Sequence, residues 1–125
     1  MKAMPGNPQR SPRVFLVEDE TLLVMLLEIM LEDMGYTLAF HASSLADGLA
    51  YAHSGDFDMA ILDINIIGGN SLPIAAALAH RRIPFTFCSG YGRLGVPEIW
   101  ADRHCVVKPF SAEQLEAALH GLLED

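Results

Sequence analysis

Four sets of polar residues in this chain could take part in one piece of chemistry, because each set ends or follows a short apolar run. In chain order the sets are Glu18 with Asp19, Asp63 with Asn65, Ser89 with Gly90, and Lys108 with Pro109. Three carboxylates brought together repel one another unless a counter-charge lies between them. Carboxylate oxygens suit Mg²⁺, which takes one or two protein carboxylates and keeps several waters. The acids therefore predict a magnesium site.

The charges of these residues also suit a phosphoryl group. The three acids are balanced by Lys108 and a divalent cation. A phosphoryl group adds a charge of about −1.5 to −2 and three acceptor oxygens. The cation, the lysine, the Ser89 hydroxyl and main-chain amides could stabilise that added charge. The set thus predicts a carboxylate nucleophile that forms an aspartyl-phosphate.

Apolar runs alternate with helical patterns along the chain. The predicted strands cover 14–17, 37–40, 57–64, 84–88 and 105–107. The predicted helices cover 21–34, a segment capped by Ser43 or Ser44 that runs to Ser54, the segment 73–82, and a segment from the Ser111 capping box to Leu123. Residues 65–70 contain two glycines and are predicted to be a loop. Any helix within 92–102 is short or broken, because this segment contains Gly95 and Pro97.

This alternation predicts an α/β fold, a doubly wound five-stranded parallel sheet with helices on both faces. In such sheets ligands bind beyond the carboxyl ends of the strands, where the four polar sets lie. Residues 1–12 contain three prolines and are predicted to be a flexible N-terminal tail. Residues 13–125 are then one domain.

Composition excludes several classes of protein. With 51% hydrophobic and 19% charged residues, the chain is not intrinsically disordered. Residues 14–125 have five basic against sixteen acidic residues, so we expect no nucleic-acid binding. The longest apolar run has six residues and the start lacks a secretory signal, so we predict a cytoplasmic protein without membrane contact. Cys88 and Cys105 are expected to pack as apolar residues on neighbouring strands, and the five histidines lack metal-site spacing.

Over about residues 13–123 the chain resembles the receiver domain of two-component response regulators. The matching motifs are FLVEDE (Phe15–Glu20), ILDIN (Ile61–Asn65), FCSGYG (Phe87–Gly92) and VVKPF (Val106–Phe110). The resemblance implies a flavodoxin-like sheet with strand order 2-1-3-4-5. It makes Asp63 the phosphoacceptor and a metal ligand, and Asp19 a direct Mg²⁺ ligand. Glu18 would help directly or through water, and the Asn65 main-chain carbonyl would complete the protein ligands.

The resemblance also implies roles for the later motifs. Ser89 would be the switch hydroxyl, and Lys108 would bind the phosphoryl group and precede a cis peptide bond. Most receivers carry an aromatic residue at the position of Cys105 and a proline shortly after the phosphoacceptor, where this chain has Ile66–Gly68. These departures resemble an atypical single-domain subgroup with a Phe-x-Thr/Ser-Gly-x-Tyr-type motif. Tyr91 would then take over part of the switching role.

The predicted helix 21–34 indicates a partner. Ten of its fourteen residues are apolar, more than the stripe that covers one side of a sheet requires. We expect the excess to form an exposed apolar patch beside the acidic site, unless the whole helix is covered. Receivers commonly use this helix to contact a histidine kinase or a histidine phosphotransfer protein.

Together these features predict a single-domain response regulator that accepts a phosphoryl group on Asp63 and then signals to an unknown protein or acts as a phosphate sink. It would be a switch with slow autodephosphorylation, not a turnover enzyme. The alternative is a receiver-like binding module that works without phosphorylation. An aspartate-nucleophile phosphatase would need a second aspartate where Asn65 stands. A flavin-binding domain would need a phosphate-cradling loop in place of the acids at 18–20.

Overall fold

The computed structural model describes residues 11–90, 96–100 and 103–124. Its elements in order are β1 (Arg13–Val17), α1 (Thr21–Asp33), β2 (Thr37–Ala42), α2 (Leu45–Ser54), β3 (Met59–Asp63), β4 (Asn65–Ile66), β5 (Gly69–Asn70), α3 (Leu72–His80), β6 (Phe85–Ser89), a 3₁₀ turn η2 (Glu98–Trp100), β7 (His104–Val107) and α4 (Ala112–Leu123). The predicted tail, apart from its last two residues, and Tyr91 lie outside the described part. Of the tail, Pro12 already belongs to the fold, because its carbonyl accepts a hydrogen bond from Thr37 N at 2.9 Å.

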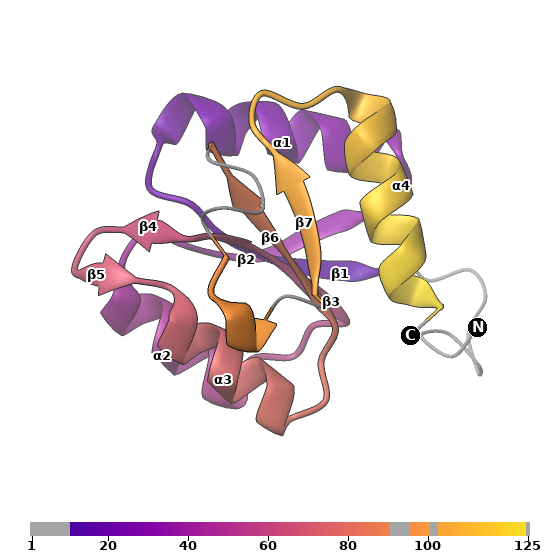
Figure 1. Ribbon diagram of the computed structural model, residues 1–125. Coiled ribbons are helices and arrows are strands. Elements are labelled where there is room, and N and C mark those ends of the chain that lie inside the picture. The colour runs from indigo at the N-terminus through magenta and orange to yellow at the C-terminus, as the bar shows by residue number, and fades with distance from the viewer. Residues whose placement is uncertain (1–10, 91–95, 101–102, 125) are drawn as a thin grey trace.

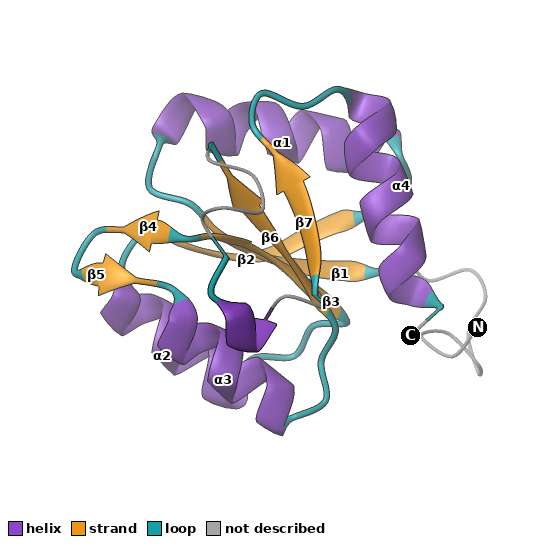
Figure 2. Cartoon of the chain, in the orientation of Figure 1, coloured by secondary structure: helices purple, strands orange, loops and turns teal. Residues whose placement is uncertain are grey.

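A five-stranded parallel sheet forms the centre of the domain, in the order β2-β1-β3-β6-β7. This order confirms the predicted 2-1-3-4-5 arrangement, with β6 and β7 as the fourth and fifth strands. Helices α1 and α4 cover one face and α2 and α3 cover the other (Figure 1). The carboxyl ends of all five strands therefore lie along one edge of the sheet (Figure 2).

Alternation along the strands divides the core between the two faces. On β1, Phe15 and Val17 face the α2 and α3 side, whereas Val14 and Leu16 pack with α1 and α4. The two cysteines follow the same rule. They lie on the neighbouring strands β6 and β7, as predicted, but Cys88 pairs in register with Val106 and Cys105 with Phe87. Because the two thiols belong to the cores of opposite faces, they cannot form a disulfide without rearrangement of the strands.

The helix starts agree with the caps predicted from the sequence. The Ser44 hydroxyl accepts a hydrogen bond from Asp47 N, and Ser111 forms a capping box with Gln114. Pro73 lies in the first turn of α3, where a missing N–H costs nothing. Within the described residues no helix has the length and apolar character needed to cross a membrane.

One local prediction was wrong. Residues 65–70, expected to be irregular loop, form a small antiparallel hairpin of β4 and β5. Its turn is possible because Gly68 has φ +93° and Gly69 has φ +144°, conformations that side chains disfavour. The hairpin is attached to the start of α2, where Leu45 N donates to Ile67 O at 2.9 Å. Smaller differences concern bounds: β2 extends to Ala42, β3 begins only at Met59, and α3 ends at His80.

Candidate functional site

Glu18 and Asp63 meet at the carboxyl edge of the sheet, where β1 and β3 lie side by side. Lys108 Nζ lies 3.1 Å from Glu18 Oε1 and 3.3 Å from Asp63 Oδ2. The lysine comes from the end of β7, and its main-chain N–H donates to Ser89 O at 2.9 Å. Residues 90 positions apart in the sequence thus form one ion-paired cluster.

Asp19 adds a third carboxylate to this cluster, and the three carboxylates together could hold a cation. One oxygen each from Glu18, Asp19 and Asp63 lies within 4.8 Å of the other two. Glu18 is buried, Asp63 is half-buried and Asp19 is exposed to solvent. The donors are hard oxygens, their negative charge exceeds that of the single lysine, and Asp19 opens the site to solvent. These residues fit Mg²⁺ and its retained waters.

Burial and the excess of negative charge shift the pKa values of Glu18, Asp63 and Lys108. Burial raises the pKa of Asp63, the charge of Asp19 raises it further, and Lys108 only partly opposes the shift. Burial and the charge of Asp63 likewise raise the pKa of Glu18. For Lys108, burial lowers the pKa, but the hydrogen bond to Glu18 and the charge of Asp63 outweigh it, so the lysine stays charged. An added positive charge would therefore stabilise the ionised carboxylates of the site.

Ser89 and Asn65 lie at the same edge of the sheet. Ser89 ends β6 and is buried, one residue beyond Cys88, which pairs in register with Asp63. Asn65 is exposed and begins the β4–β5 hairpin, two residues after Asp63. The peptide bond between Lys108 and Pro109 is cis, as the resemblance implied.

Cys105 lies away from the acidic cluster. Its side chain is half-buried and packs against the core of the α2 and α3 face. Trp100 packs against the same core, with ring centroids 5.8 Å from Phe85 and 6.5 Å from Phe87. The aromatic packing on this side of β6 thus includes the 3₁₀ turn η2, whereas β7 supplies a small thiol.

Two contacts of Glu18 escaped the sequence reasoning. Glu18 was expected to assist the metal, but its carboxylate also binds Lys108, a pairing that the charge balance of the set could have suggested. The main-chain carbonyl of Glu18 accepts a hydrogen bond from the His41 ring at 2.8 Å. No spacing pattern marks His41, because it acts through space from a neighbouring strand.

The predicted apolar patch is present on α1, so the expectation of excess apolar surface is confirmed and the fully covered helix is excluded. Four apolar side chains are more than half exposed: Leu22 by 78%, Met25 by 56%, Leu26 by 51% and Ile29 by 59%. Their spacing of three and four residues places them on one side of the helix. At its start the patch adjoins a groove of about 360 Å³. The groove is lined by Glu20, Leu23, Leu26, Lys108, Pro109 and Phe110, so it connects α1 to the acidic cluster.

The fold and the acidic cluster define a doubly wound α/β domain with a carboxylate site at the carboxyl edge of its sheet. The model of the response regulator receiver domain matches residues 14–120, and the chain belongs to this family. Receiver domains are the phosphoacceptor switches of two-component systems, they bind Mg²⁺ in an acidic pocket, and they interact with kinases or phosphotransfer proteins. They are generally not enzymes.

Individual relatives agree with this assignment. The chain is 30% identical over 115 residues to the transcriptional regulatory protein DltR of Streptococcus agalactiae, covering 86% of this chain and 50% of DltR. It is 30% identical over 120 residues to the aerobic respiration control protein ArcA of Escherichia coli, covering 91% of this chain and 49% of ArcA. The chain thus spans about half the length of these curated relatives.

Solved structures extend the comparison. SdrG from Sphingomonas melonis Fr1 has a TM-score of 0.80 and 39% identity, covering 91% of this chain and 98% of SdrG. The receiver domain of the sensor histidine kinase PA1611 from Pseudomonas aeruginosa has a TM-score of 0.78 at 17% identity, covering 92% of this chain and 99% of that one. That second structure carries a magnesium ion in its active-site cleft, and at this identity it supports the fold alone.

Proposed function

We propose that this chain works as a single-domain response regulator whose phosphoacceptor is Asp63. The observation that carries the proposal is the joint placement of Asp63, Lys108 and a three-carboxylate cluster at one sheet edge. A carboxylate oxygen of Asp63 attacks the phosphorus of a phosphohistidine. The P–O bond forms as the P–N bond breaks, and the imidazole leaves with the bonding electron pair. The product is an aspartyl-phosphate.

The residues around Asp63 divide the remaining work. Asp19, Asp63, the Asn65 carbonyl and Glu18, directly or through water, would hold Mg²⁺. Bound there, the ion would neutralise charge on the phosphoryl oxygens. Lys108, now shared between two carboxylates, would bind a phosphoryl oxygen, and the Ser89 hydroxyl would donate to another. Ser89 and Tyr91 would then change position and alter the surface that a downstream protein recognises. Because Cys105 stands where most receivers have an aromatic residue, the usual coupling through that ring would be absent.

Labelling of two matched aspartate variants tests the proposal. Asp58 precedes β3 and Asp63 ends it, so the two residues lie at opposite ends of one strand. With Mg²⁺ and either acetyl phosphate or a phosphorylated kinase, we expect a shifted band on a phosphate-affinity gel for the wild type and for Asp58→Asn. Asp63→Asn should give none. Equal labelling of Asp63→Asn, or failure of both donors on the wild type, would reject the mechanism.

A phosphorylation-independent binding module is the second candidate. The observation in its favour is Cys105, a small thiol at the β7 position where most receivers have an aromatic residue that couples to the switch hydroxyl. Tight binding to a partner that stays unchanged in Asp63→Asn would support this candidate. Rapid turnover of a generic phosphomonoester would instead indicate a phosphatase.

We further propose that the α1 patch receives the kinase or the phosphotransfer protein. The patch continues into the groove beside Lys108, so a helix docked on it could bring a phosphohistidine to Asp63. Leu22→Glu with Ile29→Glu should slow phosphotransfer from the kinase by about tenfold or more, since buried interface anchors are worth over about 1.4 kcal/mol. Labelling by acetyl phosphate should stay unchanged.

The control for this test is Ile99→Glu. Ile99 is 80% exposed on η2, so its replacement adds one glutamate charge, as each of the two α1 substitutions does, to an apolar surface position away from α1. Unchanged phosphotransfer in the α1 variant would reject the docking site.

A further inference from the structure

Glu18 is held at each of its polar groups. Its main-chain N–H donates to Ala42 O at 3.0 Å, and its carbonyl accepts from His41 Nε2 at 2.8 Å. Its carboxylate accepts from Lys108 Nζ at 3.1 Å and from Glu20 N at 3.1 Å. Since Asp19 is the next residue, these bonds also fix the position of the main chain from which the Asp19 carboxylate extends.

The His41 contact is the one of these bonds in which the side chain of another residue binds the main chain of Glu18. A carbonyl oxygen only accepts hydrogen bonds, so the ring nitrogen Nε2 must carry the hydrogen. β2 ends at Ala42, and the chain then turns to Ser44, which caps α2 and bridges to Ile67. The His41 ring therefore adds a hydrogen bond between β2 and the Glu18 carbonyl, close to the point where the strand ends.

We propose that His41 is a positioning residue for the metal-binding turn. The Glu18 carbonyl belongs to the peptide plane that joins Glu18 to Asp19. Holding this carbonyl fixes that plane, and with it the direction in which the Asp19 side chain leaves the main chain. Without the donor the plane turns more freely, and Asp19 spends less time beside Asp63. This inference rests on the proposed function, since it concerns the affinity of the same site for Mg²⁺.

Two substitutions separate the hydrogen bond from the bulk of the ring. His41→Leu fills similar space without a donor, whereas His41→Gln carries an amide N–H at similar reach. We expect His41→Leu to weaken Mg²⁺ binding about fivefold, which corresponds to the net worth of one hydrogen bond, about 1 kcal/mol. His41→Gln should stay within about twofold of the wild type. His53→Leu, which removes an exposed histidine on α2, is the matched control and should change nothing.

Magnesium affinity is measured by following backbone amide signals of the metal-free proteins during titration with MgCl₂. Acetyl phosphate labelling is then compared at limiting and at saturating Mg²⁺. A positioning role predicts slower labelling of His41→Leu at limiting Mg²⁺ and a wild-type rate at saturation. A thermal melt confirms that each variant is folded.

The outcomes are distinct. Unchanged Mg²⁺ affinity in His41→Leu would overturn the inference, and so would equal weakening in His41→Leu and His41→Gln, because packing rather than the donor would then matter. In both cases wild-type phosphorylation of Asp63 would leave the proposed function standing. If the wild type bound no Mg²⁺, the proposed function would fail and this inference with it.

Discussion

At the carboxyl edge of the sheet, the carboxylates of Glu18, Asp19 and Asp63 lie together with Lys108 between two of them. At the amino edge the charged side chains are spread out and bind the main chain. Arg81 donates to Ala52 O at 2.8 Å and to Gly55 O at 2.9 Å. The carboxyl edge thus concentrates like charges, whereas at the amino edge a charged side chain binds the carbonyls at the end of a helix.

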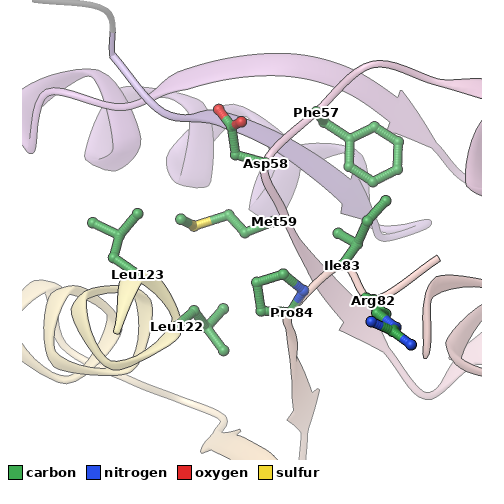
Figure 3. Close-up of a pocket in the computed structure, with 8 residues that line it drawn as sticks. All are labelled: Phe57, Asp58, Met59, Arg82, Ile83, Pro84, Leu122 and Leu123. Atoms are coloured by element: carbon green, nitrogen blue, oxygen red, sulfur yellow. The ribbon is translucent and has the colours of Figure 1, made fainter. Parts of the chain in front are cut away.

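The amino edge also has a hollow of its own. A cavity of about 250 Å³ opens there between β3, the start of β6 and the end of α4 (Figure 3). Its lining is mostly apolar, with Asp58 and Arg82 as the charged members, and comprises Phe57, Asp58, Met59, Arg82, Ile83, Pro84, Leu122 and Leu123. The Asp58 carboxylate accepts from Arg13 N at 2.8 Å and so ties β1 to the start of β3. Charge at this edge stabilises the fold, and charge at the other edge is available for a ligand.

Arg81→Ala gives the largest expected effect on stability and probes the amino edge. The variant loses two charge-assisted hydrogen bonds and the contact of the guanidinium with the Phe57 ring. It should lose about 2–3 kcal/mol of unfolding free energy. Urea unfolding measures this loss, and acetyl phosphate labelling of the folded protein should not change. A stability equal to the wild type would show that the two carbonyls are satisfied by water.

Asp63→Asn probes the opposite edge and should stabilise the metal-free protein. The pKa of Asp63 is raised above 3.8 by burial and by Asp19, so its ionised form opposes folding. For a group with a raised pKa, the stability it contributes is present below the unfolded value and is lost as pH rises through the folded value. The advantage of the variant in EDTA should therefore be negligible near pH 3.8 and grow toward neutrality.

Thermal melts from about pH 4 to pH 7.5 measure this difference. Added Mg²⁺ should reduce or reverse it, because the cation stabilises the folded wild type in proportion to its binding. A variant less stable than the wild type at pH 7.5 in EDTA would contradict the comparison, since Lys108 would then outweigh the repulsion.

Most of the site could be predicted because it depends on topology. Once five apolar runs were assigned to a parallel sheet, the residues after each run had to lie along one edge. That argument brought Asp63 and Lys108 together, although 45 positions separate them in the sequence. The α1 patch was predictable for a similar reason, since an excess of apolar residues on one helix needs no knowledge of its neighbours.

The features that could not be predicted depend on individual bonds between distant segments. The hairpin after Asp63 needs two glycines at positive φ and the anchoring of Ile67 by the start of α2. The bond from His41 to the Glu18 carbonyl joins a side chain to a main-chain atom 23 positions away. Such pairs leave no periodic pattern, because they depend on side-chain rotamers and on where a strand happens to end.

The smallest expected effect lies at the amino edge, where two helices end in the same motif with different residues. After α1, Tyr36 N donates to Leu31 O and Gly35 has φ +89°. After α3, Ile83 N donates to Leu78 O, but the left-handed position is taken by Arg82, with φ +61°. A side chain at this position costs free energy that glycine avoids.

Arg82→Gly should therefore raise the unfolding free energy by about 0.5–1 kcal/mol, because the relieved strain exceeds the added entropy of the unfolded chain. Gly35→Ala should lower it by a similar amount, which makes the two variants mirror-image controls. Urea unfolding measures both. Because Arg82 also lines the apolar cavity, a loss of stability in Arg82→Gly would mean that its side chain packs there more favourably than its backbone is strained, and the amino edge would then rely on this arginine as it does on Arg81.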